Sequence, residues 1–246
     1  MALGKPENAL ESYEKALSVF NEMDDRLGKA RAYSNIGIIA AMQGRYADAE
    51  VYYQNGLEIS RTSGNRGEEA NMLLNLGLVC FEQGEFSDSV RYGTEAREIF
   101  LELGDVEMEG MALGNLGFAL EHTGDLEGAE RCALESLDCA KRSNNLLETG
   151  LRMTYAAKYR ILSGGGEGEL AELTQGLSLL DEAGILEYIA EGRLNLGQVL
   201  AHLGRHEEAC VELQSVIATG GDSSLVGISK IAQEMLAKSK CAGKTG

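Results

Sequence analysis

The sequence repeats itself with a period of 40 residues, and this period restricts the fold more than any other feature. Three markers recur at this period. The first is a string of Asn, an apolar residue and Gly. The second is a single glycine, and the third is a residue that is Gly, Asn or Asp. These residue types tolerate the positive φ that closes a helix. The strings begin at Asn35, Asn75, Asn115 and Asn195; the glycines are Gly44, Gly84, Gly124, Gly164 and Gly204; the third series is Asp24, Gly64, Gly104, Asn144 and Gly184.

Between these markers, apolar residues recur three and four positions apart, which is the spacing of an amphipathic helix. Each block therefore predicts two helices, over residues 28–42 and 46–62 in the first block. A helix hairpin of this kind cannot bury its apolar stripe alone, so neighbouring hairpins must stack. The sequence predicts an all-α solenoid of antiparallel helix hairpins.

In this frame, residues 1–246 form a single solenoid. We expect a half repeat, a capping helix and five full repeats between them. The half repeat covers residues 4–24 and holds a second helix only; the full repeats cover 28–64, 68–104, 108–144, 148–184 and 188–222; the capping helix covers 225–240. A chain that opens on a second helix predicts a fragment of a larger protein, with an open N-terminal face through which two copies associate.

The fourth repeat is degenerate. It has Tyr155, Ala156 and Ala157 where the other repeats have the Asn string, and three glycines, residues 164–166, at its turn. We expect this repeat to be helical but irregular.

The first full repeat resembles the tetratricopeptide repeat pattern, in which an aromatic residue precedes Leu-Gly and an Ala and a Phe follow downstream. The matching residues are Tyr33, Ile36, Gly37, Ala40, Ala49 and Tyr53. The resemblance covers almost the whole chain, although 40 residues exceed the usual period of about 34. This length is similar to the long-repeat branch of kinesin light chains, spindle-orientation adaptors and bacterial signalling and transcription regulators. The resemblance implies a right-handed superhelix whose first helices line a concave groove.

The charge of the chain argues against two classes of partner. Its 39 acidic and 22 basic residues give a net charge of −17, which repels phosphate backbones and anionic membranes. No apolar run approaches the roughly 20 residues that span a bilayer, and the N-terminus lacks a secretory signal. We expect a cytoplasmic protein that binds neither nucleic acid nor membranes. The five cysteines include no CxxC pair and so provide no zinc spacing.

No motif of catalysis is present. His202 and His206 have the spacing of a metal-binding pair, but Gly204 lies between them at a predicted turn, so they belong to different helices. The glycines at 164–166 are not a phosphate loop, because no Gly-Lys-Ser/Thr follows them. The sequence predicts no catalytic residue, no metal and no cofactor, and therefore no enzyme.

The candidate site is the face that the first helices share. By resemblance to the family, ligand-facing positions of the first three repeats carry an apolar strip, and the asparagines form a ladder beside it. The strip consists of Ile38, Leu74, Leu78, Phe81, Met111 and Phe118; the ladder consists of Asn35, Asn75, Asn115 and Asn195. An amide both donates and accepts hydrogen bonds, so a row of amides can pair with the backbone of an extended peptide. The alternatives are that the apolar residues pack helix against helix and that each Asn binds the neighbouring repeat.

These features predict a non-catalytic scaffold for protein interactions that binds a peptide or helical segment of a protein partner in its concave groove. The alternative is a regulatory sensor segment of a bacterial signalling or transcription protein. Such a segment binds a small molecule or a short signalling peptide.

Overall fold

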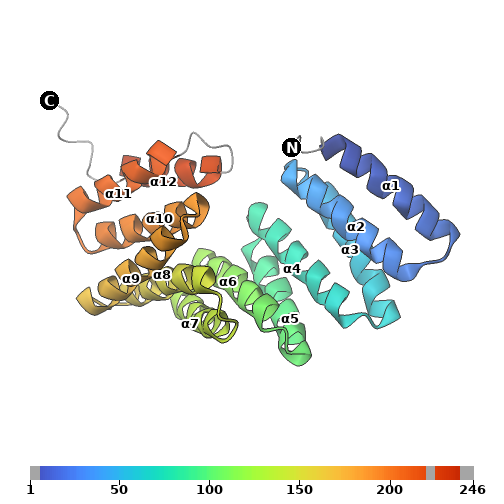
Figure 1. Ribbon diagram of the computed structural model, residues 1–246, viewed down its shortest axis with the longest axis horizontal. Helices are drawn as coiled ribbons and strands as arrows, with labels where there is room; N and C mark the ends of the chain where they lie inside the picture. Colours follow the sequence, from blue (N-terminus) through green and yellow to red (C-terminus); the bar gives the residue numbers. More distant parts are fainter. Residues whose placement is uncertain (1–5, 220–224, 239–246) are drawn as a thin grey trace. The chain divides into compact units, whose positions relative to one another are not determined.

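The computed structural model describes residues 6–219 and 225–238, and within these residues the chain forms helices and no strands. The helices are α1 (Pro6–Glu22), α2 (Arg26–Met42), α3 (Tyr46–Ser63), α4 (Arg66–Glu82), α5 (Phe86–Leu103), α6 (Val106–Thr123), α7 (Leu126–Arg142), α8 (Leu146–Leu162), α9 (Glu167–Ala183), α10 (Leu186–His202), α11 (His206–Thr219) and α12 (Val226–Lys238). Helix pairs such as α2 with α3 and α8 with α9 pack as antiparallel hairpins (Figure 1). The predicted all-α stack of helix hairpins is confirmed.

The helices follow the 40-residue period of the sequence. The first helices of the hairpins (α2, α4, α6, α8 and α10) begin at residues 26, 66, 106, 146 and 186. The helix α1 lies in the segment expected to be a half repeat, and α12 in the expected capping segment. Residues 4–5, 220–222 and 239–240 of those predicted segments lie outside the described residues.

The turns confirm the marker residues. All five glycines of the second series have positive φ, as do Gly64, Gly104 and Gly184 of the third. Asp24 and Asn144, with φ of 51° and 53°, take the left-handed conformation where that series lacks glycine. Their short polar side chains tolerate this conformation better than other side chains do. The next residue then often caps the following helix, as when the side chain of Asn145 accepts a hydrogen bond from the Glu148 N–H.

The fourth repeat is helical, as expected, and its two helices are regular. The segments α8 and α9 are continuous helices of 17 residues each. Ala156 and Ala157 are strong helix formers that fill the positions of Leu and Gly in the other repeats. The three glycines all fall in the turn, where Gly164 has φ of 109°. The irregularity is therefore limited to that turn, after which α9 begins at Glu167.

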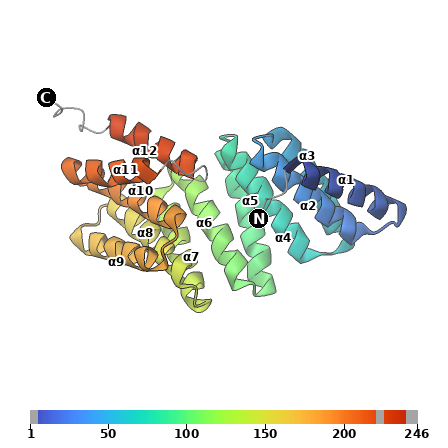
Figure 2. The ribbon, with the colours of Figure 1, turned by 45° about the horizontal axis from the view of Figure 1, so that its top comes forward.

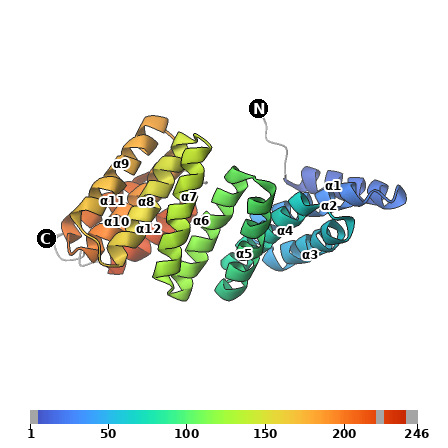
Figure 3. The same cartoon turned by 90° about the horizontal axis from the view of Figure 1, so that it is seen from below.

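The chain forms two compact units, Met1–Gly124 (unit 1) and Asp125–Gly246 (unit 2). In unit 1, α4 lies beside α5 and α5 beside α6 (Figure 2), and the core includes Tyr53, Met72 and Phe100. In unit 2, α8 lies between α7 and α9 (Figure 3). Leu213 and Leu225 belong to a core cluster of α10, α11 and α12. Each unit is thus stabilised by its own buried apolar residues.

Close approach of two helices explains the glycine of the Asn string. A Cβ atom added to Gly37 on α2 would lie 2.6 Å from the Tyr53 ring on α3. Tyr53 is 2% exposed, so its ring has little room to move. The hairpin of α2 and α3 therefore requires a residue without a side chain at position 37.

Replacing Gly37 with alanine is expected to lower the free energy of unfolding by about 1–3 kcal/mol, because the added methyl group overlaps a buried ring. Urea denaturation followed by circular dichroism measures this change. Gly67→Ala on α4 is the matched control, since a Cβ there would meet only the Asn65 side chain at 3.9 Å. Alanine favours a helix over glycine, so G67A should match or slightly exceed the wild type. Equal losses in both variants would contradict the packing argument.

Candidate functional site

Residues spaced by four, three and four positions lie on one face of a helix. The first helices of unit 1 each present such a column on the same side, and α4 contacts both α2 and α6. We name these residues the ladder face of unit 1. They are Arg31, Asn35, Ile38 and Met42 on α2, Asn71, Asn75, Leu78 and Glu82 on α4, and Met111, Asn115, Phe118 and His122 on α6. Every one of these residues is half-buried or exposed.

The ladder face of unit 1 exposes apolar side chains. Ile38, Leu78 and Met111 are 40%, 46% and 44% exposed, and Met42 is 81% exposed. Ile38, Leu78 and Phe118 occupy the same position in three successive repeats and so form one apolar row. Exposed apolar residues grouped on one face are typical of an interaction surface.

Leu74 of the predicted strip lies elsewhere. It is 7% exposed and belongs to the core cluster of unit 1. It directly precedes Asn75, and neighbouring residues of a helix point about 100° apart. Its side chain therefore stabilises the stack of helices and adds no open surface.

Phe81, the remaining residue of the strip, packs in an aromatic cluster beside the ladder face. Its ring centroid lies 5.5 Å from that of Phe86 on α5 and 4.9 Å from that of His122 on α6. The rings of Phe86 and His122 are 4.7 Å apart. The strip did not include Phe86, which follows the hairpin turn, but the recurrence of an aromatic residue at Tyr46 and Phe86 could have indicated it.

The asparagines of unit 1 keep their amide groups available. Asn35, Asn75 and Asn115 are half-buried, and within the described part of the chain their side chains make no hydrogen bond. A half-buried amide without a protein partner can accept a hydrogen bond through its oxygen and donate one through its nitrogen to a ligand. No hydrogen bond within the protein has to break for this, and only bound water is released.

Asn195, at the same position of the fifth repeat, has a different environment. It is 3% exposed, and its Nδ2 donates a hydrogen bond to Thr154 Oγ1 on α8 at 3.1 Å. This amide joins α10 to α8. In unit 2 the asparagine position thus contributes to the contact between two repeats.

The corresponding face of unit 2 is closed by its own side chains. The helices α8 and α10 contact each other directly, and Tyr155 takes the place of the ladder asparagine on α8. Its hydroxyl donates a hydrogen bond to the Glu191 carboxylate on α10. Lys158 is 3% exposed, and its Nζ lies 4.6 Å from the centroid of the Tyr159 ring. These contacts bury the side chains of this face, so it offers little exposed surface to a ligand.

Burial has a marked effect on the acid–base behaviour of this closed face. It raises the pKa of the Tyr155 hydroxyl well above its ordinary value, and the nearby Glu191 carboxylate adds to the shift. Burial also raises the pKa of Glu191 above its ordinary value, although the hydrogen bond from Tyr155 and the charge of Arg152 oppose the shift. The folded protein therefore holds the Glu191 proton more tightly than the unfolded chain does.

This shift makes unit 2 sensitive to pH. The stability that comes from a raised carboxyl pKa is fully present below the unfolded value of about 4.3 and is lost as pH rises through the folded value. Glu191→Gln cannot ionise and still accepts the Tyr155 hydrogen bond. It is expected to be more stable than the wild type near neutral pH and to lose less stability between acidic and neutral pH.

Urea denaturation across that pH range measures the effect. Glu182→Gln is the control, because Glu182 is exposed near the end of α9, and it should keep the slope of the wild type. If E191Q also keeps that slope, Glu191 does not carry the pH dependence.

No three His, Cys, Asp or Glu side chains in residues 6–219 and 225–238 are grouped so as to hold a metal ion. His202 ends α10 and His206 begins α11, so the two lie on different helices, as predicted. Within the same residues, no helix combines the length and apolar character needed to cross a membrane.

The stacked hairpins and the shared face of their first helices define the class of the protein: it is a repeat scaffold for protein interactions. A tetratricopeptide repeat model matches residues 1–62 and 68–142, and a second tetratricopeptide repeat model matches residues 190–215. The chain belongs to the tetratricopeptide repeat family.

Solved structures share this fold at low sequence identity. The apo form of RapI is 13% identical with a TM-score of 0.72, covering 95% of this chain and 90% of that one. BtubC (BKLC) from P. vanneervenii is 13% identical with a TM-score of 0.69, covering 98% and 96%. A Rap protein complexed with competence and sporulation factor is 13% identical with a TM-score of 0.65, covering 93% and 68%. These similarities confirm the predicted class, a right-handed α-solenoid. No curated protein sequence matches the chain.

Proposed function

We propose that the ladder face of unit 1 binds an extended peptide segment of a protein partner, without catalysis. One observation carries this proposal. Asn35, Asn75 and Asn115 keep their amides available on an open face, whereas Asn195 uses its amide inside the protein. A row of available amides suits a backbone ligand, because each can accept from a peptide N–H and donate to a peptide carbonyl.

The spacing of the helices fits such a ligand. Packed helices lie about 8–10 Å apart, and an extended chain advances about 3.3 Å per residue. One step from α2 to α4, or from α4 to α6, therefore corresponds to about three peptide residues, and the three columns correspond to about seven. The apolar row of Ile38, Leu78 and Phe118 supplies surface for the apolar side chains of that segment.

A second candidate is a sensor segment that binds a short signalling peptide. The observation that favours it is the similarity in fold to Rap proteins, one of which was solved in complex with competence and sporulation factor. Both candidate functions use the ladder face. They differ in the ligand, because a short signalling peptide has a free amino and a free carboxyl terminus, whereas a segment inside a longer partner has neither. The closed face of unit 2 gives no comparable support to a small-molecule sensor.

The test uses peptides selected from a random display library on the immobilised chain and then synthesised. The double variant Asn75→Ala/Asn115→Ala is expected to weaken peptide affinity about tenfold or more, because two hydrogen bonds of about 0.5–1.5 kcal/mol each are lost. Its unfolding curve should stay near that of the wild type, since neither amide bonds the protein. Isothermal titration calorimetry measures the affinity.

Asn195→Ala is the matched control at the same ladder position. It removes the hydrogen bond to Thr154, so it should cost about 1 kcal/mol of stability and leave peptide affinity unchanged. Leu78→Asp places a charge in the exposed apolar row and should abolish binding. If the selected peptides bind N75A/N115A as tightly as the wild type, the ladder face is not the site.

Peptides with acetylated and amidated ends separate the two candidates. A segment inside a longer partner has no free ends, so blocked peptides should bind as well as free ones. Loss of binding on blocking would favour the signalling peptide. The predicted self-association through the N-terminal face stays a prediction, which light scattering at rising protein concentration can test. Val19 on α1 and Met23 in the turn after it are 50% and 70% exposed. The predicted cytoplasmic location likewise stays a prediction.

A further inference from the structure

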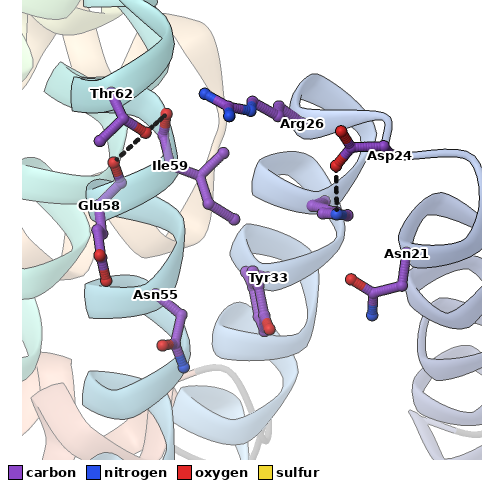
Figure 4. Close-up of a pocket in the computed structure, with 9 residues that line it drawn as sticks. Asn21, Asp24, Arg26, Tyr33, Asn55, Glu58, Ile59 and Thr62 are labelled. Atoms are coloured by element: carbon purple, nitrogen blue, oxygen red, sulfur yellow. Dashed lines mark hydrogen bonds and ion pairs between the residues drawn. The ribbon is translucent and has the colours of Figure 1, made fainter.

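Unit 1 contains a pocket of about 510 Å³ between α1, α2 and α3, apart from the ladder face. None of the ladder residues lines it. Figure 4 shows Asn21 on α1, Arg26 and Tyr33 on α2, and Asn55 and Thr62 on α3 around this space. Lys29 of α2 also lines it. The pocket therefore presents two cations, two amides and a phenol to one hollow that is open to solvent.

The equivalent place one repeat later is filled by an ion network. There Arg61 contacts Glu69 at 3.0 Å and Glu95 at 2.9 Å. Arg66 contacts Glu69 and Glu102, both at 2.8 Å. Glu69 is only 7% exposed. The three carboxylates thus neutralise both guanidinium groups between α3, α4 and α5.

A shift of 40 residues relates this network to the pocket. Lys29, Asn55 and Thr62 stand where the network has Glu69, Glu95 and Glu102. Arg26 keeps the place of Arg66, and Asn21 replaces Arg61. The first repeat has therefore lost all three carboxylates of the network while it keeps one arginine and gains a lysine.

The two cations of the pocket make fewer ion pairs than the two arginines of the network. Within the described part of the chain, Arg26 has no ion pair. Its side chain extends toward Ile59 and Thr62 (Figure 4), as Arg66 reaches Glu102 in the next repeat. Lys29 contacts only Asp24, at 3.2 Å, and the Asp24 side chain is 83% exposed, so water screens this pair.

We propose that this pocket binds a small organic dicarboxylate. One carboxylate lies on Arg26, in the place of the Glu102 carboxylate, and the other lies on Lys29 and the Asn55 amide, in the places of Glu69 and Glu95. The hydroxyl of Tyr33 and the amide of Asn21 complete the donors. Asp24 and Glu58 also line the pocket, so its positive and negative side chains are equal in number.

The test is calorimetric titration of the full chain with succinate and glutarate at constant ionic strength, with neutral succinamide as the comparison. Saturable binding of the dicarboxylates without binding of succinamide is expected. Arg26→Gln/Lys29→Gln should weaken the affinity at least about tenfold, as loss of charged hydrogen bonds does. Circular dichroism verifies that this double variant is folded.

Two further variants make the test specific. Asn21→Arg/Lys29→Glu/Asn55→Glu/Thr62→Glu copies the network of the next repeat into the pocket and should abolish binding with the fold intact. Arg66→Gln disturbs the network itself and should bind succinate like the wild type.

The proposal is overturned by the absence of saturable succinate binding up to about 10 mM, by equal affinity in R26Q/K29Q, or by binding of inorganic phosphate but not succinate. Because the pocket contains no ladder residue, failure of this test leaves the peptide proposal unaffected, and the converse also holds.

Discussion

The whole architecture depends on how closely the two helices of a hairpin approach each other. Gly37 on α2 lies against the Tyr53 ring, and Gly197 on α10 against the Leu213 side chain, at distances that leave no room for a Cβ atom. The position stays small in every repeat, although it is Ala157 in the fourth, so within each unit the first helices present the same face. The ladder face is therefore a consequence of packing between the helices of each hairpin.

Register alone does not decide what a ladder position does, because the distance between neighbouring first helices also matters. Asn115 and Asn195 are equivalent in sequence, yet only Asn195 is buried with a partner, Thr154, on the adjacent first helix. The hydrogen bond from Tyr155 to Glu191 joins the same two helices. The same ladder position is thus open in unit 1, whereas in unit 2 it joins two neighbouring helices.

The sequence predicts the features that depend on local chemistry. The left-handed turns at Asp24 and Asn144 follow from which residue types tolerate positive φ, and the helices follow from the spacing of apolar residues. It could not predict that the face of unit 2 is closed or that Leu74 is buried. Those outcomes depend on side chains of different repeats that contact each other, such as Tyr155 with Glu191. The sequence of a single repeat does not indicate such contacts.

Substitutions that break the repeat pattern have different consequences at packing positions and at charged positions. Positions that pack the stack stay small or apolar, so a change there reports on stability. A change at a charged position can remove the ion pair of a partner that stays in place, although the fold does not require this loss. Lys29 in place of a glutamate beside Arg26 is such a change, since Glu69 in the next repeat shows how the same backbone satisfies its cations internally. A repeat array can thus gain a ligand pocket by losing one internal network while its helices stay as they are.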